Sequence, residues 1–264
     1  MDSIVAWLND PTVQGLVLSP LIGAVLGVLF AGISNPPPQG APPSVHQTVV
    51  IFKTTVIVNS GRVQSRNSGD AAGLFFAAFL LIAGITWGYS RYADQVLSYW
   101  TSGLYSCVAF IFSAGLASAL RGQYSRLEWV WYIFAPVVAI GICYYLVGLA
   151  HVGIIAGSKQ VALSRSFVDF YMHSLHPEQR NWILFQILGV LLGVVATVTA
   201  TLRSVYYLAL MNQRSSGGAS GLWRFIARHT EFSSQGFGLV LLMLVLATSY
   251  ALLSGYIYSW CPEP

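Results

Sequence analysis

The sequence predicts an all-α polytopic membrane protein, with about six transmembrane helices and one extra-membrane β-strand or hairpin between the first and second helices. Hydrophobic residues make up 55% of the 264 residues and charged residues 8%, about a third of the charged share in soluble domains. Six separate stretches of about 20 residues lack Asp, Glu, Lys and Arg, and that length crosses a bilayer as a helix. A short β-branched run after the first of these stretches predicts the strand. We expect a single membrane domain over residues 1–264.

The predicted spans cover residues 13–33, 71–90, 99–120, 129–150, 182–202 and 236–260. Tryptophan and tyrosine gather at several of their ends, which is typical of rings that lie at the level of the lipid headgroups. The first thirty residues contain no Lys or Arg. We therefore expect the first span to be a retained helix and not a cleaved signal peptide.

Small residues and prolines inside the spans predict how the helices pack. Glycines four residues apart allow two membrane helices to approach closely, and the pairs are Gly23 with Gly27, Gly84 with Gly88, and Gly189 with Gly193. Pro20 and Pro136 are expected to kink the first and fourth spans, because proline cannot donate a helical hydrogen bond.

The distribution of Lys and Arg between alternate connections predicts the orientation. One side collects nine of them, which are Lys53, Arg62, Arg66, Arg121, Arg126, Arg203, Arg214, Arg224 and Arg228. The other side collects four, which are Arg91, Lys159, Arg165 and Arg180. This bias predicts that both termini lie on the outer side of the membrane and that residues 34–70 are cytoplasmic.

The segment between the first two spans predicts an interaction surface. Residues 34–44 contain five prolines and should form an extended spacer. In the strand expected at 48–58, one face is nearly all apolar and the other carries Lys53. No other stretch of the sequence predicts a strand of comparable length. The backbone of the 48–58 strand would therefore pair with another copy of the chain or with a separate protein. The residues expected to interact are Val50, Phe52, Lys53, Thr54, Val56 and Val58. The alternatives are a membrane-surface segment or a disordered loop.

Two further segments are expected to lie on the membrane surface. In residues 164–182, an interfacial helix ended by Pro177 would place Phe167, Phe170, Tyr171 and Leu175 on one face. In residues 221–236, a basic amphipathic helix follows a Gly/Ser hinge, and its surface residues would include Trp223, Arg224, Phe225 and Arg228. Anionic lipid headgroups suit the second helix, and docking of a partner protein is the alternative.

The sequence contains no strong catalytic or cofactor-binding motif. His173 and His176 with Asp169 form only a weak metal-ligand pattern, because no further ligand follows at a suitable spacing. The motifs of intramembrane proteases, phosphate-binding loops and dinucleotide-binding folds are missing. We therefore expect no enzyme, no catalytic residues, no cofactor and no metal. Nucleic acid is not an expected partner, because the basic residues lie in connections between spans.

The function predicted from these observations is that of a non-enzymatic integral membrane subunit. It would anchor or scaffold an oligomeric or multi-protein membrane complex through its strand and its amphipathic loops, with membrane lipids as further partners. An oligomeric channel or membrane-permeabilising effector is the alternative, and a small-solute transporter is a third hypothesis.

Overall fold

The computed structural model describes residues 13, 17–32, 71–120, 126–215, 220–233 and 236–260, and within these ranges the chain is helical and contains no β-strand. The helices are α3 (Ser19–Gly32), α5 (Ala71–Leu120), α6 (Arg126–Trp129), η3 (Val130–Phe134), α7 (Ala135–Val152), α8 (Ser158–Ser164), α9 (Phe167–Asp169), η4 (Phe170–Ser174), α10 (Pro177–Ser215), α11 (Ser220–Thr230), η5 (Glu231–Ser233), α12 (Gly236–Leu253) and η6 (Tyr258–Trp260). The strand predicted at 48–58 lies outside the described residues.

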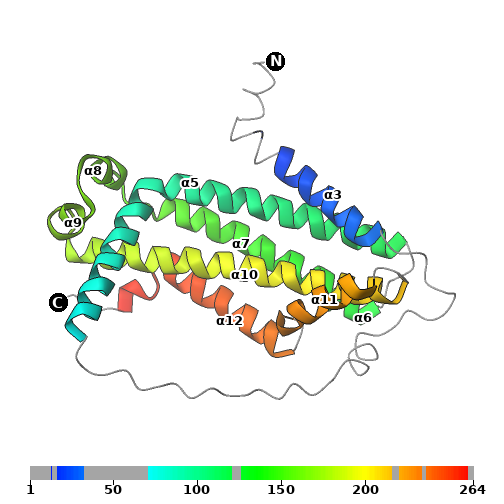
Figure 1. The fold of residues 1–264 in the computed structure, drawn as a ribbon. Coiled ribbons are helices and arrows are strands. Elements are labelled where there is room, and N and C mark those ends of the chain that lie inside the picture. Colours follow the sequence, from blue (N-terminus) through cyan, green and yellow to red (C-terminus); the bar gives the residue numbers. More distant parts are fainter. Residues whose placement is uncertain are drawn as a thin grey trace.

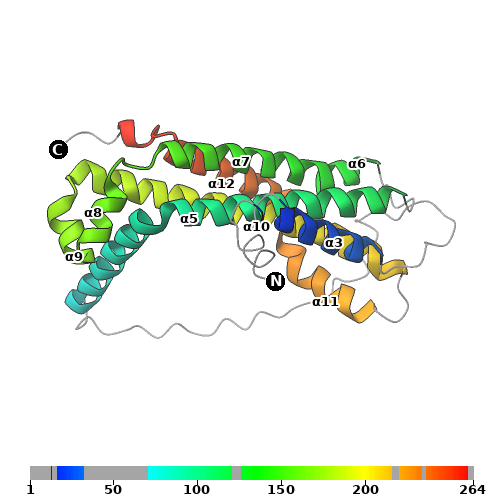
Figure 2. The same cartoon turned by 90° about the horizontal axis from the view of Figure 1, so that it is seen from above.

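Long helices lie side by side in a bundle, and α10 packs against α5, α7, α11 and α12 (Figures 1 and 2). Among the described residues, three helices are long and apolar enough to cross a membrane, which agrees with the predicted integral membrane protein. They cover Phe79–Leu120, Val130–Val152 and Pro177–Gln213. A fourth span results if Gly221–Ser233 and Gly238–Leu253, which meet at a bend of 56°, cross together. The predicted number of six spans is not supported.

The second and third predicted spans are one continuous helix, α5. The residues between them contain Ala, Arg, Gln and Leu, which favour helix, and no Gly or Pro that would end one. The two charges in this stretch also find partners. The Arg91 guanidinium lies 5.2 Å from the centre of the Trp87 ring, and Asp94 accepts a hydrogen bond from Lys159 Nζ at 2.6 Å. A polar stretch therefore continues the helix where the sequence predicted a loop.

The first part of α5 leaves the bundle at a steep angle (Figures 1 and 2). The Ser90 hydroxyl donates to the Thr86 carbonyl at 2.9 Å, and the Thr86 hydroxyl donates to the Ile82 carbonyl at 2.8 Å. Such bonds to the preceding turn bend helices. Gly84 and Gly88 lie in the same part of the helix, and no neighbouring side chain lies within 4 Å of the position that a Cβ would take. The close packing predicted for this glycine pair is therefore wrong.

The last predicted span is shorter than expected, and the first is described only in part. Within 13–33 the structure describes residues 13 and 17–32, of which Ser19–Gly32 form the α-helix α3. Pro20 follows the π-helical residues Val17 and Leu18 and lies in the first turn of the α-helical part, α3, so the kink predicted there stays a prediction. The helix α12 ends at Leu253, and Gly255 then adopts a φ of 77°, which a residue with a side chain rarely takes.

The continuity of α5 also changes the basis of the predicted orientation. The count of Lys and Arg assumed two membrane crossings between Arg66 and Arg121. One helix occupies that interval, so the connections before and after it no longer fall on the same side by alternation.

Glycines at four-residue spacing do bring helices together at two of the three predicted places. A Cβ on Gly189 would lie 2.7 Å from Leu253 of α12, and one on Gly193 would overlap the Trp100 ring of α5. Gly23 and Gly27 of α3 meet the backbone and side chains of α5 in the same way. The prediction of close helix approach is confirmed for these two pairs.

We expect Gly193→Ala to destabilise the folded protein by about 1–3 kcal/mol, because the added methyl must displace the packed Trp100 ring. Thermal unfolding of the purified protein in lipid nanodiscs measures the effect. Gly141→Ala is the matched control, since it makes the same change in a membrane helix where nothing lies within 4 Å. Equal unfolding temperatures for the two variants would contradict this packing.

Candidate functional site

A polar cluster near the α6 end of the bundle begins with a backbone irregularity before Pro136. Residues Val130–Phe134 form a wider, π-helical turn, in which the Ala135 N–H donates to the Val130 carbonyl. Pro136 has no N–H. An N–H at position 136 would bond the Trp131 carbonyl in a π-helix and the Tyr132 carbonyl in an α-helix. Without that donor, both carbonyls need partners from elsewhere.

Arg203 and Ser204 of α10 supply these partners. Arg203 Nε donates to the Trp131 carbonyl at 3.2 Å, and the Ser204 hydroxyl donates to the Tyr132 carbonyl at 2.9 Å. Arg203 Nη1 also donates to the Ser233 carbonyl at 3.1 Å, at the break between α11 and α12. One guanidinium thus bonds two irregular segments that are far apart in the sequence.

Aromatic rings surround the guanidinium. Its Cζ lies 4.9 Å from the centre of the Tyr132 ring, which also stacks on Tyr207 at 5.7 Å between centres and 13° between planes. Arg203 is only 4% exposed. A buried charge of this kind is stable because its donors are bonded and a ring face lies beside it.

The sequence analysis placed Arg203 in a loop, because it directly follows the apolar run 182–202. The structure places it inside α10, with its side chain turned into the bundle. One sequence signal could have predicted this role of Arg203: a proline lies inside one span, and an arginine lies at the end of another. Sequence alone does not show that the two lie at the same level of the bundle.

The other end of α7 is closed by a second pair of bonds from α10. Gln186 Nε2 donates to the Ala150 carbonyl at 2.7 Å, and Trp182 Nε1 donates to the Gly153 carbonyl at 2.8 Å. Ala150 lies in the last turn of α7 and Gly153 directly follows that helix, where carbonyls run out of helical donors. In the middle of the bundle, the Ser249 hydroxyl of α12 donates to the Gly189 carbonyl at 2.7 Å.

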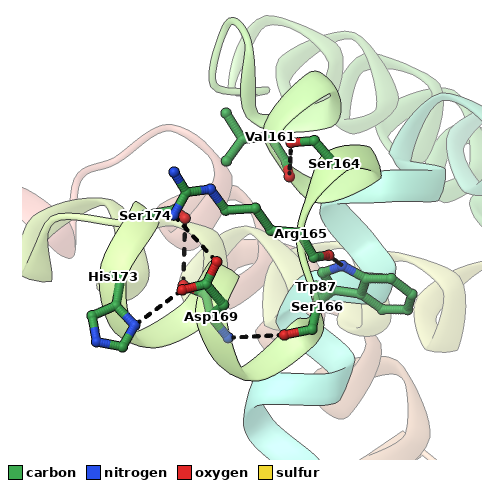
Figure 3. Close-up of polar contacts among 8 residues, drawn as sticks. All are labelled: Trp87, Val161, Ser164, Arg165, Ser166, Asp169, His173 and Ser174. Atoms are coloured by element: carbon green, nitrogen blue, oxygen red, sulfur yellow. Dashed lines mark hydrogen bonds and ion pairs between the residues drawn. The ribbon is translucent and has the colours of Figure 1, made fainter.

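A small helical cap, formed by α8, α9 and η4, packs against α5, and Figure 3 shows polar contacts among its residues and Trp87. Trp87 Nε1 of α5 donates to the carbonyls of Ala162 at 2.8 Å and Arg165 at 3.1 Å. Within the cap, Asp169 accepts from Arg165 Nη1 and lies beside His173 Nδ1, both at 3.2 Å. The Asp169 carboxylate is thus engaged in side-chain pairs within the cap, and no group of three metal-ligating side chains is found in the described ranges.

The structure separates the predicted membrane-surface residues into buried and exposed groups. Phe170 and Leu175 are buried with Ala162 and Ile183 in the core of the cap, so they do not lie on a surface. Phe167 is exposed, and Tyr171 contacts the Arg180 guanidinium at 5.2 Å. The helical segment ends at Ser174, and Pro177 begins α10.

The same separation holds in α11. Trp223 is buried against α10, whereas Arg224, Phe225 and Arg228 are exposed. The predicted interaction residues Val50, Phe52, Lys53, Thr54, Val56 and Val58 lie outside the described residues.

No family model, curated protein or solved structure matches the chain.

We expect Arg203→Met to destabilise the protein by about 2–4 kcal/mol, because the Trp131 and Ser233 carbonyls lose their donor inside the bundle. Arg203→Lys should recover only part of this loss, since one ammonium does not reproduce the planar fork. Thermal unfolding in nanodiscs measures both variants. Arg165→Met, which removes an exposed ion pair, is the control and should cost less than about 1 kcal/mol.

The same mechanism predicts coupling to Pro136. An alanine at position 136 supplies the missing N–H, so the π-helical turn can become α-helical and satisfy its own carbonyls. The loss of stability caused by Arg203→Met should therefore be smaller in the Pro136→Ala background than in the wild type, by at least about 1 kcal/mol. Additive effects of the two substitutions would show that the arginine does not serve the turn.

We expect Trp87→Phe to loosen the cap while the bundle stays folded, because two bonds to cap carbonyls are lost and the ring remains. Amide hydrogen exchange should become faster in residues 158–176 and remain unchanged in α7. Trp131→Phe, at an exposed indole, provides the control. Equal exchange in the two variants would show that these bonds do not hold the cap.

Proposed function

We propose that the chain is a non-enzymatic integral membrane subunit that anchors an oligomeric or multi-protein membrane complex. The observation that carries the proposal is the first part of α5. It projects from the bundle, and it leaves Leu81, Ile82 and Ile85 exposed, with Leu81 at 61%. An apolar helix surface of this kind is stable only when lipid or protein covers it.

The length of α5 favours protein as part of that cover. The apolar stretch Phe79–Leu120 has 42 residues, or about 63 Å of helix, whereas a bilayer with its headgroups is about 40–45 Å thick. Measured along its bent axis, a helix of this length is longer than a bilayer is thick. The cap packs on one side of the projecting part, through the Trp87 bonds and the Phe79 contact with Tyr171. The other side remains for a partner.

The use of polar side chains inside the bundle supports an anchoring role over a conducting one. Arg203, Ser204, Gln186 and Ser249 all donate to carbonyls of neighbouring helices. Trp100 of α5 likewise donates to the Thr197 hydroxyl of α10 at 3.1 Å. These groups hold helices in register, so their polar atoms are engaged in packing.

Disulfide crosslinking in native membranes tests the proposal. Single cysteines replace Phe52, Val56 and Ile85 in a background where Cys107, Cys143 and Cys261 are alanine. We expect crosslinked products at these three positions, either with another copy or with a second protein that also purifies with the chain in mild detergent. Leu191→Cys, on an exposed apolar side of α10, measures random collision in the membrane.

The proposal would be overturned if crosslinks at these positions form no faster than at Leu191→Cys and the protein is a solitary monomer in detergent. Products at Ile85 alone would retain the anchoring role and remove the predicted strand from it.

A further inference from the structure

Helix α11 has an inner face that is fully used in packing. Trp223 is 1% exposed and lies in the same core cluster as Tyr207 and Met211 of α10. Ala227 and Thr230 are also buried. This face fixes the rotation of α11 about its axis, so the side chains on the outer face are set by the helical period.

The outer face carries a basic strip and an apolar strip, and the exposed His229 lies against Phe225 of the apolar strip, with 4.0 Å between the ring centres. Arg224 and Arg228 are four residues apart and form a basic strip. Leu222 and Phe225 form an apolar strip beside it, at 57% and 60% exposed. Phe232 of η5, at 63% exposed, follows seven residues after Phe225. The sequence analysis had expected a basic amphipathic helix with Trp223 on its surface. The structure gives α11 three faces, which are the buried face with Trp223, the basic strip and the apolar strip.

The position of α11 along the bundle places these strips at a membrane boundary. The uncharged part of α10, residues 182–202, has 21 residues, about 32 Å of helix, which matches the hydrocarbon thickness of about 30 Å. Arg203 begins the part of α10 that follows, and α11 packs against α10, with Trp223 in the same core cluster as Tyr207 and Met211 of that part. Figure 1 shows α11 beside the C-terminal end of α10, at the same end of the bundle as α6.

We propose that α11 lies at the bilayer surface and binds anionic phospholipid headgroups through Arg224 and Arg228, with Leu222, Phe225 and Phe232 inserted among the upper acyl carbons. A basic strip next to an apolar strip fits the boundary between headgroups and chains, because each strip then meets its own environment. A protein partner would need to cover both strips at once. This surface is separate from the projecting part of α5 and does not depend on the anchoring role.

Spin labels on the full-length protein in liposomes that contain phosphatidylglycerol test the placement. The labels replace Phe225 or Arg228 in the background without native cysteines. We expect the label at position 225 to be accessible to oxygen and protected from a water-soluble nickel complex, and the label at 228 to show the reverse. Protection of position 225 from both reagents would indicate a covering protein, and exposure to nickel would indicate water. Either result overturns the proposal.

The preference for anionic lipid tests the chemistry. Retention of spin-labelled phosphatidylglycerol relative to phosphatidylcholine should fall about fivefold for each arginine removed in Arg224→Gln/Arg228→Gln. Lys159→Gln/Arg165→Gln removes the same charge from the other end of the bundle and should retain the wild-type preference. An unchanged preference in the first variant, or an equal loss in both, would overturn the assignment to α11.

Discussion

The hydrocarbon of a membrane offers no hydrogen-bond partner, so every backbone carbonyl that a helix fails to satisfy must be bonded by the protein itself. In this chain, Pro136 leaves carbonyls without helical donors in η3, and the break before α12 exposes the Ser233 carbonyl. Arg203 bonds both places, and Tyr132 lies over its guanidinium. The proline, the π-helical turn, the bend of 56° and the buried arginine are therefore parts of one arrangement. A change in any of them alters the hydrogen bonding of the others.

The same constraint explains why α10 is the central helix. At one end it carries Arg203 and Ser204, and at the other Trp182 and Gln186, so it satisfies carbonyls at both ends of the η3–α7 column. Between these ends, its glycines let α5 and α12 approach closely. Apolar burial alone does not select one rotation of a helix among apolar neighbours in lipid, because lipid is as apolar as the side chains. The directional bonds select it, and the glycines allow the short distances that those bonds require.

The two ends of the bundle expose different surfaces. At one end, the first part of α5 projects with an apolar side exposed, and the cap is bonded to it through Trp87. At the other end, α11 exposes a basic strip and an apolar strip next to each other. The first surface is suited to protein, since the helix is longer than a bilayer is thick. The second is suited to the lipid boundary, since its two strips match headgroups and chains. An anchoring subunit would use the two ends in these separate ways.

Composition and hydropathy by themselves determined the membrane class, the helical character and the central parts of α7 and α10, because apolar runs of bilayer length have few other stable solutions. Glycine spacing also identified two of the three places where helices meet closely. The tertiary structure decided whether a polar stretch is a loop or helix, as in residues 91–98, because Asp94 finds Lys159, a partner 65 positions away. It also decided which side of an amphipathic segment is buried, as for Phe170 and Trp223, and where Arg203 points. These choices depend on contacts between residues far apart in the chain, which local patterns do not contain.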